Sequence, residues 1–223
     1  MVSSPSRALS RSSRDRLLVA AAAEFAARGF DGATVDRIAA RARVNKAMIY
    51  YHFRSKARLY REILCDVFAG VADRAEAVRE AGGPPAHQLR ALVEAVAAGA
   101  VAQPHFPPIW LREMAEDGRH VDRAIAVQLR RVLAVLQGIL DDGQRAGHFR
   151  AANAMVIHIG IVAPLVLFAA SRPVRERFAA LTRDQGEVTP EAVIRHVQAA
   201  TLAVLAVDRT TRGSRPPKRR RKS

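Results

Sequence analysis

Cysteine is almost absent from this chain of 223 residues, in which Cys65 is the single example. One cysteine excludes an intramolecular disulfide and a zinc site made of several cysteines, and it suits the reducing cytoplasm, where we expect the protein. The histidines His105, His120 and His158 show no spacing typical of a metal site on a helix. A Gly-rich phosphate loop and a nucleophile elbow are also missing. We therefore expect no metal, no cofactor and no enzymatic activity.

Aromatic residues and long apolar runs are scarce as well. Aromatic residues make up 5% of the chain, and the longest apolar stretch, residues 155–170, contains His158, Gly160 and Pro164. A helix that spans a bilayer needs about 20 predominantly apolar residues, so this stretch predicts a buried or interfacial helix and no membrane partner. Residues 1–16 are rich in Ser and Arg and lack the apolar centre of a secretory signal. Ala, Leu and Val recur at helical spacing throughout, which favours an all-α protein.

Positive charge is abundant and is concentrated at the two ends of the chain. Residues 1–60 carry 12 Lys and Arg against 4 Asp and Glu, residues 61–207 carry 16 of each, and residues 208–223 carry 8 against 1. The net charge of +15 therefore belongs to the ends, while the middle is electrically balanced. This distribution predicts a polyanionic partner, most simply a nucleic acid.

Residues 34–53 predict two short helices joined by a three-residue turn. The residues that form an apolar stripe before the turn, and the apolar anchors after it, are Val35, Ile38, Ala39 and Ala42, then Val44, Ile49 and Phe53. The hydroxyl of Thr34 can cap the first of these helices. The side chains then left facing outward are Asn45, Lys46, Met48 and Tyr50. Two helices at this spacing are the layout of a DNA-reading helix-turn-helix.

The motifs around this segment carry a resemblance to a known family. The sequence Gly29-Phe30-Asp31-Gly32-Ala33-Thr34-Val35, followed by Ile38-Ala39, Val44 and Ile49-Tyr50-Tyr51-His52-Phe53-Arg54-Ser55-Lys56, resembles the TetR family of bacterial transcriptional regulators over roughly residues 12–62. Residues 108–114 and 147–150 are similar to what many members carry further along. The resemblance implies about nine helices: three that bind DNA, a fourth that connects, three that surround a ligand pocket, and a last two that form a homodimer.

The expected domain organisation follows from this resemblance and from the charge distribution. A flexible basic arm covers residues 1–11, a helix-turn-helix DNA-binding domain residues 12–57, a ligand-binding and dimerisation domain residues 58–207, and a disordered basic tail residues 208–223. Two positions depart from the family pattern. Arg43 stands in the turn where glycine is usual, which would cost about 1 kcal/mol in a left-handed conformation, and Ala47 stands where glycine or proline is common.

The candidate DNA-binding residues divide into base readers and phosphate contacts. Asn45 can pair with adenine, Lys46 can reach guanine, and Met48 or Ala47 can touch a thymine methyl. The resemblance implies that backbone phosphates are contacted by Thr34, Tyr50, Tyr51, His52 and Lys56. Solvated or core roles remain open for each, with core packing the alternative for Tyr50 and Tyr51.

A ligand pocket is expected beside the proline-broken segment at residues 104–108. The candidate lining residues are Phe106, Trp110, Leu111, Met114, His120, Ile125, Met155 and His158. Aromatic and Met side chains at helical spacing are more often simply core, and this alternative stays open for all eight.

The leading hypothesis is a dimeric repressor that binds a palindromic DNA operator and is released by a small, largely apolar effector. A first alternative is an architectural DNA-binding protein with low sequence specificity, suggested by the basic tail. A second, an enzyme with a DNA-binding head, requires a catalytic constellation in residues 86–207, where none is apparent. The sequence discloses neither the effector nor the operator, nor whether the protein represses or activates.

Overall fold

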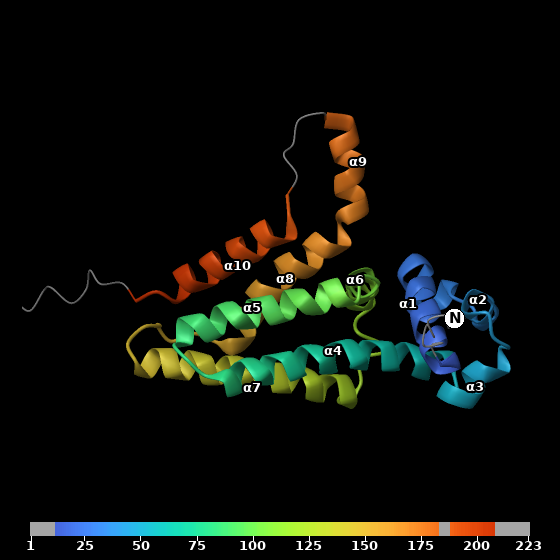
Figure 1. Cartoon of the computed structure of the whole chain (residues 1–223), viewed down its shortest axis with the longest axis horizontal. Helices are drawn as coiled ribbons and strands as arrows, with labels where there is room; N and C mark the ends of the chain where they lie inside the picture. Colours follow the sequence, from blue (N-terminus) through green and yellow to red (C-terminus); the bar gives the residue numbers. More distant parts are fainter. Residues whose placement is uncertain (1–11, 183–187, 208–223) are drawn as a thin grey trace, which may run out of the picture.

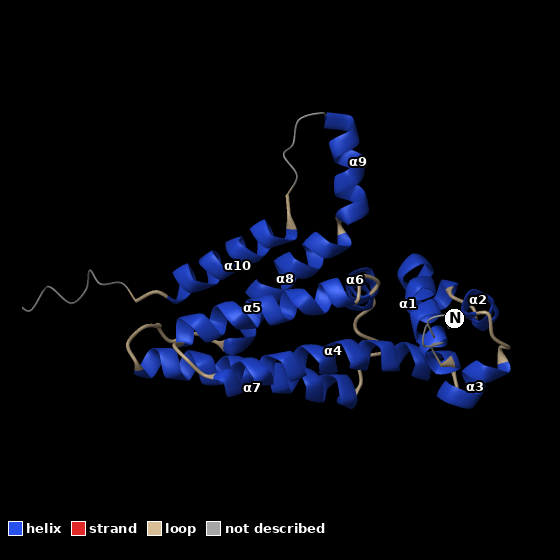
Figure 2. Ribbon diagram, viewed as in Figure 1, coloured by secondary structure: helices blue, strands red, loops and turns tan. Residues whose placement is uncertain are grey.

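The structure is a computed structural model, which describes residues 12–182 and 188–207. This part of the chain forms helices joined by short loops and contains no strand (Figures 1 and 2), so the all-α expectation is confirmed. The helices are α1 (Ser13–Gly32), α2 (Val35–Ala42), α3 (Ala47–Phe53), α4 (Lys56–Ala81), α5 (Pro85–Ala102), α6 (Phe106–Ala115), α7 (Arg123–Arg145), α8 (Ala154–Ala170), α9 (Arg172–Thr182) and α10 (Pro190–Leu205). The predicted arm, residues 1–11, and tail, residues 208–223, lie outside the described residues.

Helices α1 to α3 form a small head with its own apolar core. Leu17 and Phe25 of α1, Ile38 of α2 and Ile49 of α3 are fully buried together. Within α1 the backbone leaves the helical conformation at Gly29, with φ 71° and ψ 178°. The chain then resumes a helical turn to Gly32, because Ala33 donates its N–H to the Gly29 carbonyl at 3.3 Å.

Helix α4 runs from the head into the body of the molecule (Figure 1). Its first half buries Leu59 and Leu64 in the head core, and its second half packs on α5 and α7. On the outside, Arg131 of α7 pairs with Asp73 at 2.7 Å and Glu76 at 2.5 Å, and its guanidinium lowers the pKa of Glu76 below the ordinary value. These exposed pairs fix the register of α4 against α7 and contribute little net stability.

The described part contains ten helices, one more than expected. The extra helix is α9, whose eleven residues carry no long apolar period that would have revealed it. Helix α9 projects from the body, whereas α8 packs along α10 (Figure 1). The two adjacent helices at this end are therefore α8 and α10, although α9 lies between them in the sequence.

Within the described residues, no single helix has the length and apolar character needed to cross a membrane. Helices α8 and α9 meet that requirement on length and composition only if they are counted together, and they are bent by 58° at their junction.

Candidate nucleic-acid interface

The turn between α2 and α3 is closed by backbone hydrogen bonds around a left-handed arginine. The hydroxyl of Thr34 accepts the N–H of Arg37 at 3.3 Å and so caps α2, as predicted. At the other end, Arg43 has φ 54° and ψ 47°, and its N–H donates to the Ala40 carbonyl at 3.1 Å. Val44 donates to the Ala39 carbonyl at 3.1 Å, which completes a Schellman motif. The expected strain at Arg43 is therefore present.

Helix α3 is short and begins with a side-chain cap. Asn45 accepts the N–H of Ala47 through its Oδ1 at 2.8 Å, which satisfies one of the amides left free at a helix start. Ile49 and Phe53 are buried and hold α3 on the head core. Ala47 is exposed beside them.

The outward face of α3 carries the two tyrosines. Tyr50 is exposed, and Tyr51 is 74% exposed, so core packing does not explain either side chain. Met48, in contrast, is partly buried and packs against the head core, so it faces outward less fully than the two tyrosines. The half-buried His52 lies within 2.8 Å of the Ser13 hydroxyl through its Nε2 and so links α3 to the start of α1.

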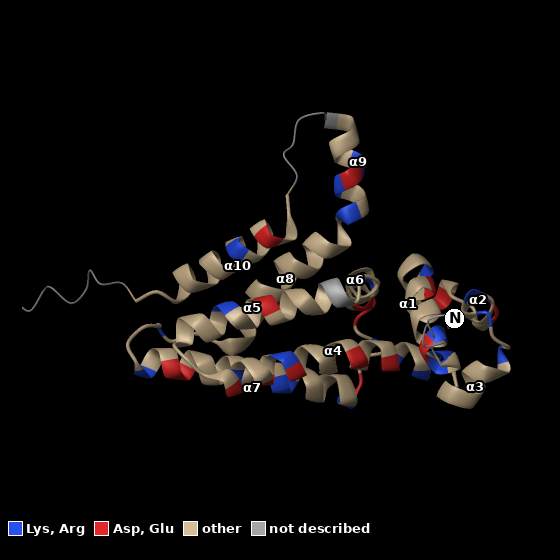
Figure 3. Cartoon of the chain, viewed as in Figure 1, with Lys and Arg blue, Asp and Glu red and all other residues tan. Residues whose placement is uncertain are grey.

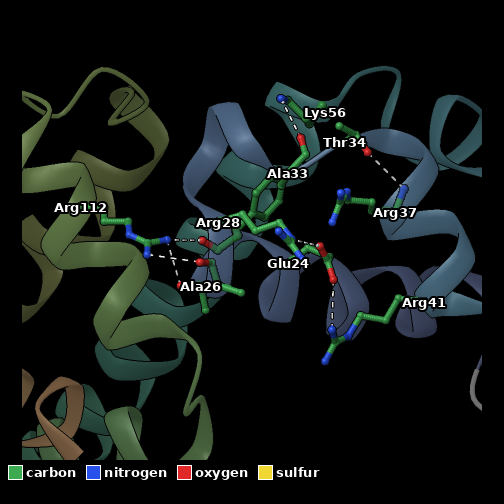
Figure 4. Close-up of polar contacts among 11 residues, drawn as sticks. Glu24, Ala26, Arg28, Ala33, Thr34, Arg37, Arg41, Lys56 and Arg112 are labelled. Atoms are coloured by element: carbon green, nitrogen blue, oxygen red, sulfur yellow. Dashed lines mark hydrogen bonds and ion pairs between the residues drawn. The ribbon is translucent and has the colours of Figure 1, made fainter. Parts of the chain in front are cut away.

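The two lysines of the predicted set differ in how they are held. Lys46 forms an exposed ion pair with Asp36 at 3.1 Å, a weak interaction that an approaching phosphate can replace. Lys56 is half-buried and donates to the carbonyls of Phe30 at 2.9 Å and Ala33 at 3.0 Å, with its ammonium 4.3 Å from the centre of the Phe30 ring. Figure 4 shows it reaching back to the α1–α2 connection. Lys56 therefore fixes the position of Thr34 through the preceding residue.

Several Lys and Arg positions lie in the head, on and near these two helices (Figure 3). The exposed cations of residues 12–54 are Arg14, Arg16, Arg28, Arg37, Arg41, Arg43, Lys46 and Arg54. Two of them are also structural, because Arg41 reaches the buried Glu24 of α1 at 3.0 Å and Arg28 meets the same carboxylate at 3.3 Å (Figure 4). Cations and hydroxyls around an exposed helix are the side chains that contact a phosphate backbone.

The eight candidate pocket residues lie in different surroundings. Phe106 and Ile125 are buried in the head core, and Trp110 stacks on Phe106 with ring centres 6.2 Å apart. Met114 and Met155 are exposed on different helices. Two open hollows lie elsewhere on the described surface. One of about 390 Å³ is lined by Arg58, Arg61, Glu62, Cys65, Asp122 and Ala124, and the other is on α9.

The remaining candidates are Leu111, His120 and His158. Leu111 is half-buried on α6. His158 is half-buried on α8, where burial lowers its pKa below the ordinary value. His120 belongs instead to a polar cluster between head and body, because the Glu113 carboxylate accepts its backbone N–H at 2.6 Å and lies 3.1 Å from its ring Nδ1.

This polar cluster, formed by Tyr60, Glu113 and His120, was missed in the sequence. Glu113 is 1% exposed and also accepts the Tyr60 hydroxyl at 2.9 Å. Burial, together with this hydrogen bond, raises the pKa of Tyr60 far above the ordinary value. A buried carboxylate is stable only when it is hydrogen-bonded, and these contacts supply the bonds across α4, α6 and the loop that follows α6.

A second contact missed in the sequence joins α6 to the end of α1. Arg112 donates to the carbonyls of Phe25 at 3.1 Å, Ala26 at 2.9 Å and Ala27 at 3.4 Å (Figure 4). These carbonyls belong to the last regular turn of α1, because the helix breaks at Gly29, and a cation is favourable at a helix C-terminus. The guanidinium of Arg112 therefore ties the body to the head.

Comparisons with known proteins agree with this arrangement. A family model described as "Bacterial regulatory proteins, tetR family" matches residues 17–63, and one described as "Tetracyclin repressor-like, C-terminal domain" matches residues 85–199. The chain belongs to the TetR family. The resemblance read from the sequence is thus confirmed, and the expectation that the chain is not an enzyme is confirmed by the regulatory nature of these matches.

Individual TetR-family relatives are similar over much of the chain. The HTH-type transcriptional repressor NicS of Pseudomonas putida is 31% identical over 139 residues, which are 61% of this chain and 66% of that protein. A tetR-family regulatory protein from Rhodococcus RHA1 gives a TM-score of 0.72 at 18% identity, over 88% of this chain and 98% of that one. The ketosteroid transcriptional regulator KstR2 of Mycobacterium tuberculosis gives a TM-score of 0.68 at 21% identity, over 89% of this chain and 97% of that one. At these identities the two structures show a common fold only.

The left-handed arginine of this TetR-family turn leads to a testable prediction. Arg43→Gly should raise the free energy of unfolding by about 1 kcal/mol, because glycine adopts a positive φ without the clash of a Cβ. The control is Ala40→Gly, at an exposed position inside α2. This substitution should lower the free energy of unfolding by about 1 kcal/mol. Urea unfolding measures both, and a loss of stability in Arg43→Gly would mean that the arginine gains more from its surroundings than the turn costs.

Proposed function

We propose that this chain is a homodimeric, DNA-binding transcriptional repressor that occupies a palindromic operator in the cytoplasm and leaves it when a small-molecule effector binds. The observation that carries the proposal is the α2–α3 helix-turn-helix, whose outward side chains are cations and tyrosine hydroxyls. Repression is supported by the name of the Pseudomonas relative, and effector response by membership of the family.

The contacts with DNA are assigned by how each side chain is held. Lys46, Asn45 and Ala47 lie at the start of α3, where a recognition helix meets base edges, and the partly buried Met48 adds an apolar edge there. Tyr50, Tyr51, Thr34 and His52 supply groups for phosphates, and Lys56 acts chiefly by holding the α1–α2 connection. The base contacts select the sequence, and the phosphate contacts set affinity and salt dependence.

The homodimer is supported by the outer surface of α8 and α10. The large apolar side chains exposed there are Met155, Val156, Ile159 and Leu167 on α8 and Val204 on α10. The buried side of α8 packs on α5 and α7, so the exposed row faces away from the body. A contiguous apolar surface of this kind is typical of a protein interface, and two helices from each copy would bury it.

The link from effector to DNA is proposed to run through α6. This helix carries Arg112, bonded to the end of α1, and Glu113, bonded to Tyr60 of α4. A ligand that favours another position of α6 therefore changes the placement of the head, and two heads must keep a fixed spacing to reach successive major grooves. We retain the domain division between residues 57 and 58 as part of this proposal. Tyr60 crosses it by packing on Phe25, and Arg112 crosses it by its bonds to the end of α1.

The test is binding to the promoter fragment of the gene that encodes the chain. In fluorescence anisotropy at low salt, the full chain should bind this fragment at least about 1,000-fold more tightly than an unrelated fragment of equal length. Footprinting should show two half-sites with centres about 10 base pairs, or a multiple of that, apart. Equal affinity for both fragments would reject sequence-specific regulation.

Deleting residues 209–223 separates this proposal from an architectural role. The deletion removes 8 basic residues, so affinity for every fragment should fall and the salt dependence should become shallower. A regulator keeps its preference for the promoter fragment, because the helix-turn-helix is intact. Loss of nearly all binding together with the preference would favour the architectural protein.

A further inference from the structure

The start of α1 forms a hydrogen bond to the recognition helix that capping of α1 does not explain. The hydroxyl of Ser13, the first residue of α1, lies 2.8 Å from Nε2 of His52 on α3. Both side chains are half-buried, and they are 39 positions apart in the chain. The preceding Ser12 already caps α1, because its hydroxyl accepts the N–H of Asp15 at 3.1 Å. The hydroxyl of Ser13 is therefore free to serve α3.

Contacts on both sides hold these two groups within reach of each other. Arg14, the residue after Ser13, lies with its guanidinium 5.5 Å from the centre of the Phe53 ring of α3 and forms an ion pair with Glu62 of α4. The ring of His52 lies edge-on against that of Tyr51, with centres 5.0 Å apart. The start of α1 and the imidazole are thus both packed in place independently of the bond between them.

Two arrangements of the protons fit this distance. Either the Ser13 hydroxyl donates to a bare Nε2 and the ring carries its proton on Nδ1, or Nε2–H donates to the hydroxyl and Nδ1 is bare. Among the described residues, the Ser13 hydroxyl has no second acceptor for its proton. The first arrangement satisfies that proton and leaves the oxygen lone pairs beside the free N–H groups at the start of α1, which carry partial positive charge.

We propose that Ser13 is a positioning residue, which holds the neutral ring of His52 in the tautomer with its proton on Nδ1, so that Nδ1 can donate to a DNA phosphate. The two ring nitrogens point in different directions, so Nδ1 faces away from α1 when Nε2 faces Ser13. A bare Nδ1 would present a lone pair to the phosphate, whereas Nδ1–H is a donor that the anion accepts. This role rests on the proposed function, in which His52 contacts a phosphate.

The tautomer is measured in the full chain without DNA, by long-range proton–nitrogen correlation spectra of the histidine rings at an alkaline pH, where imidazole is neutral. The signals of His52 are those lost in His52→Phe. We expect the proton on Nδ1 in the parent and in Ser13→Thr, which keeps the hydroxyl. In Ser13→Ala the form with the proton on Nε2 should become the major one. The matched control is Ser12→Ala, which removes the cap of α1 and should leave the tautomer of His52 unchanged.

Binding to the promoter fragment is then measured as a double-mutant cycle. Ser13→Ala should bind about tenfold more weakly than the parent, because the dimer loses the net contribution of about one hydrogen bond. In the His52→Phe background, Ser13→Ala should change the affinity by less than about twofold, since its effect passes through the ring. Ser13→Thr should restore the affinity lost in Ser13→Ala, and Ser12→Ala should bind within about threefold of the parent.

A bare Nδ1 in the parent overturns the role of Ser13, and so does a proton that stays on Nδ1 in Ser13→Ala. The role is also overturned if Ser13→Ala weakens binding equally with and without His52, because Ser13 then acts by another route. A parent chain that binds every fragment alike rejects the proposed function and with it the phosphate contact. Because the tautomer is measured without DNA, this failure is distinguishable from a failure of Ser13 to set the tautomer.

Discussion

Replacing Glu113 by alanine is expected to lower the free energy of unfolding by about 4 kcal/mol, because it leaves two buried donors without an acceptor and opens a cavity. The donors are the Tyr60 hydroxyl, 2.9 Å from the carboxylate, and the backbone N–H of His120, 2.6 Å from it. The Tyr60 ring also packs edge-on against Phe25 with centres 4.8 Å apart, so the loss spreads into the head core. Urea unfolding followed by circular dichroism measures the change.

Two further variants identify the cause of this loss. Glu113→Gln keeps an acceptor and the side-chain volume, so it should lose about half as much stability as Glu113→Ala. Glu116→Ala removes a neighbouring carboxylate whose partner, Arg119 at 2.5 Å, is largely in solvent, and should change stability by less than about 0.5 kcal/mol. The pKa of Tyr60 should also fall in Glu113→Ala, because one of the causes that raise it is removed. A loss in Glu113→Ala no larger than in Glu116→Ala would contradict the role of the cluster.

Arg112→Met should loosen the head while leaving the body folded. Methionine keeps much of the aliphatic stem and removes the guanidinium that bonds the carbonyls of Phe25, Ala26 and Ala27. Hydrogen bonds from a charged donor contribute more than neutral ones, so local opening of α1 to α3 should become easier by about 2 kcal/mol. Hydrogen exchange in these helices should then be roughly 30-fold faster, with α5, α7 and α8 unchanged.

The matched control for this variant is Arg119→Met. Arg119 also lies at the boundary of head and body, but its contact with Asp31 spans 3.9 Å between two exposed side chains. The Arg119→Met variant should leave hydrogen exchange in α1 to α3 unchanged within about twofold, as expected when only a weak surface ion pair is removed. If both variants accelerate exchange equally, general loss of charge at the boundary is the cause, and the tie formed by Arg112 is not.

The elements that could be predicted from the sequence are those governed by nearby residues. A cap needs a hydroxyl a few residues from a free amide, and Thr34 meets this condition within its own turn of chain. The left-handed conformation of Arg43 was expected because the family that the sequence resembles usually has glycine at this position of the turn. The apolar spacing of α2, with Ile38 fully buried, likewise depends only on helical periodicity.

The surroundings that could not be predicted are those set by tertiary packing. Met48 packs against the head core, and its position in α3 alone does not reveal this. The ring of His120 lies beside that of Phe30, which is far away in the chain, with centres 4.2 Å apart. Helix α9 was missed because its apolar residues cover one narrow face between charged ones.

The sequence by itself therefore indicated the family, through the motifs of residues 29–56 that resemble it. Short-range spacing alone predicted the all-helical class and the position of the helix-turn-helix. The tertiary structure alone decided how head and body are joined. The bonds from Arg112 to α1 join body and head, and the bond that Tyr60 donates to Glu113 joins α4 to α6. Both connect residues more than fifty positions apart, and no local pattern marks such pairs. The tertiary structure also decided the direction of α9, because the contacts of Arg175 with Phe168 and Ser171 hold this helix at its junction with α8.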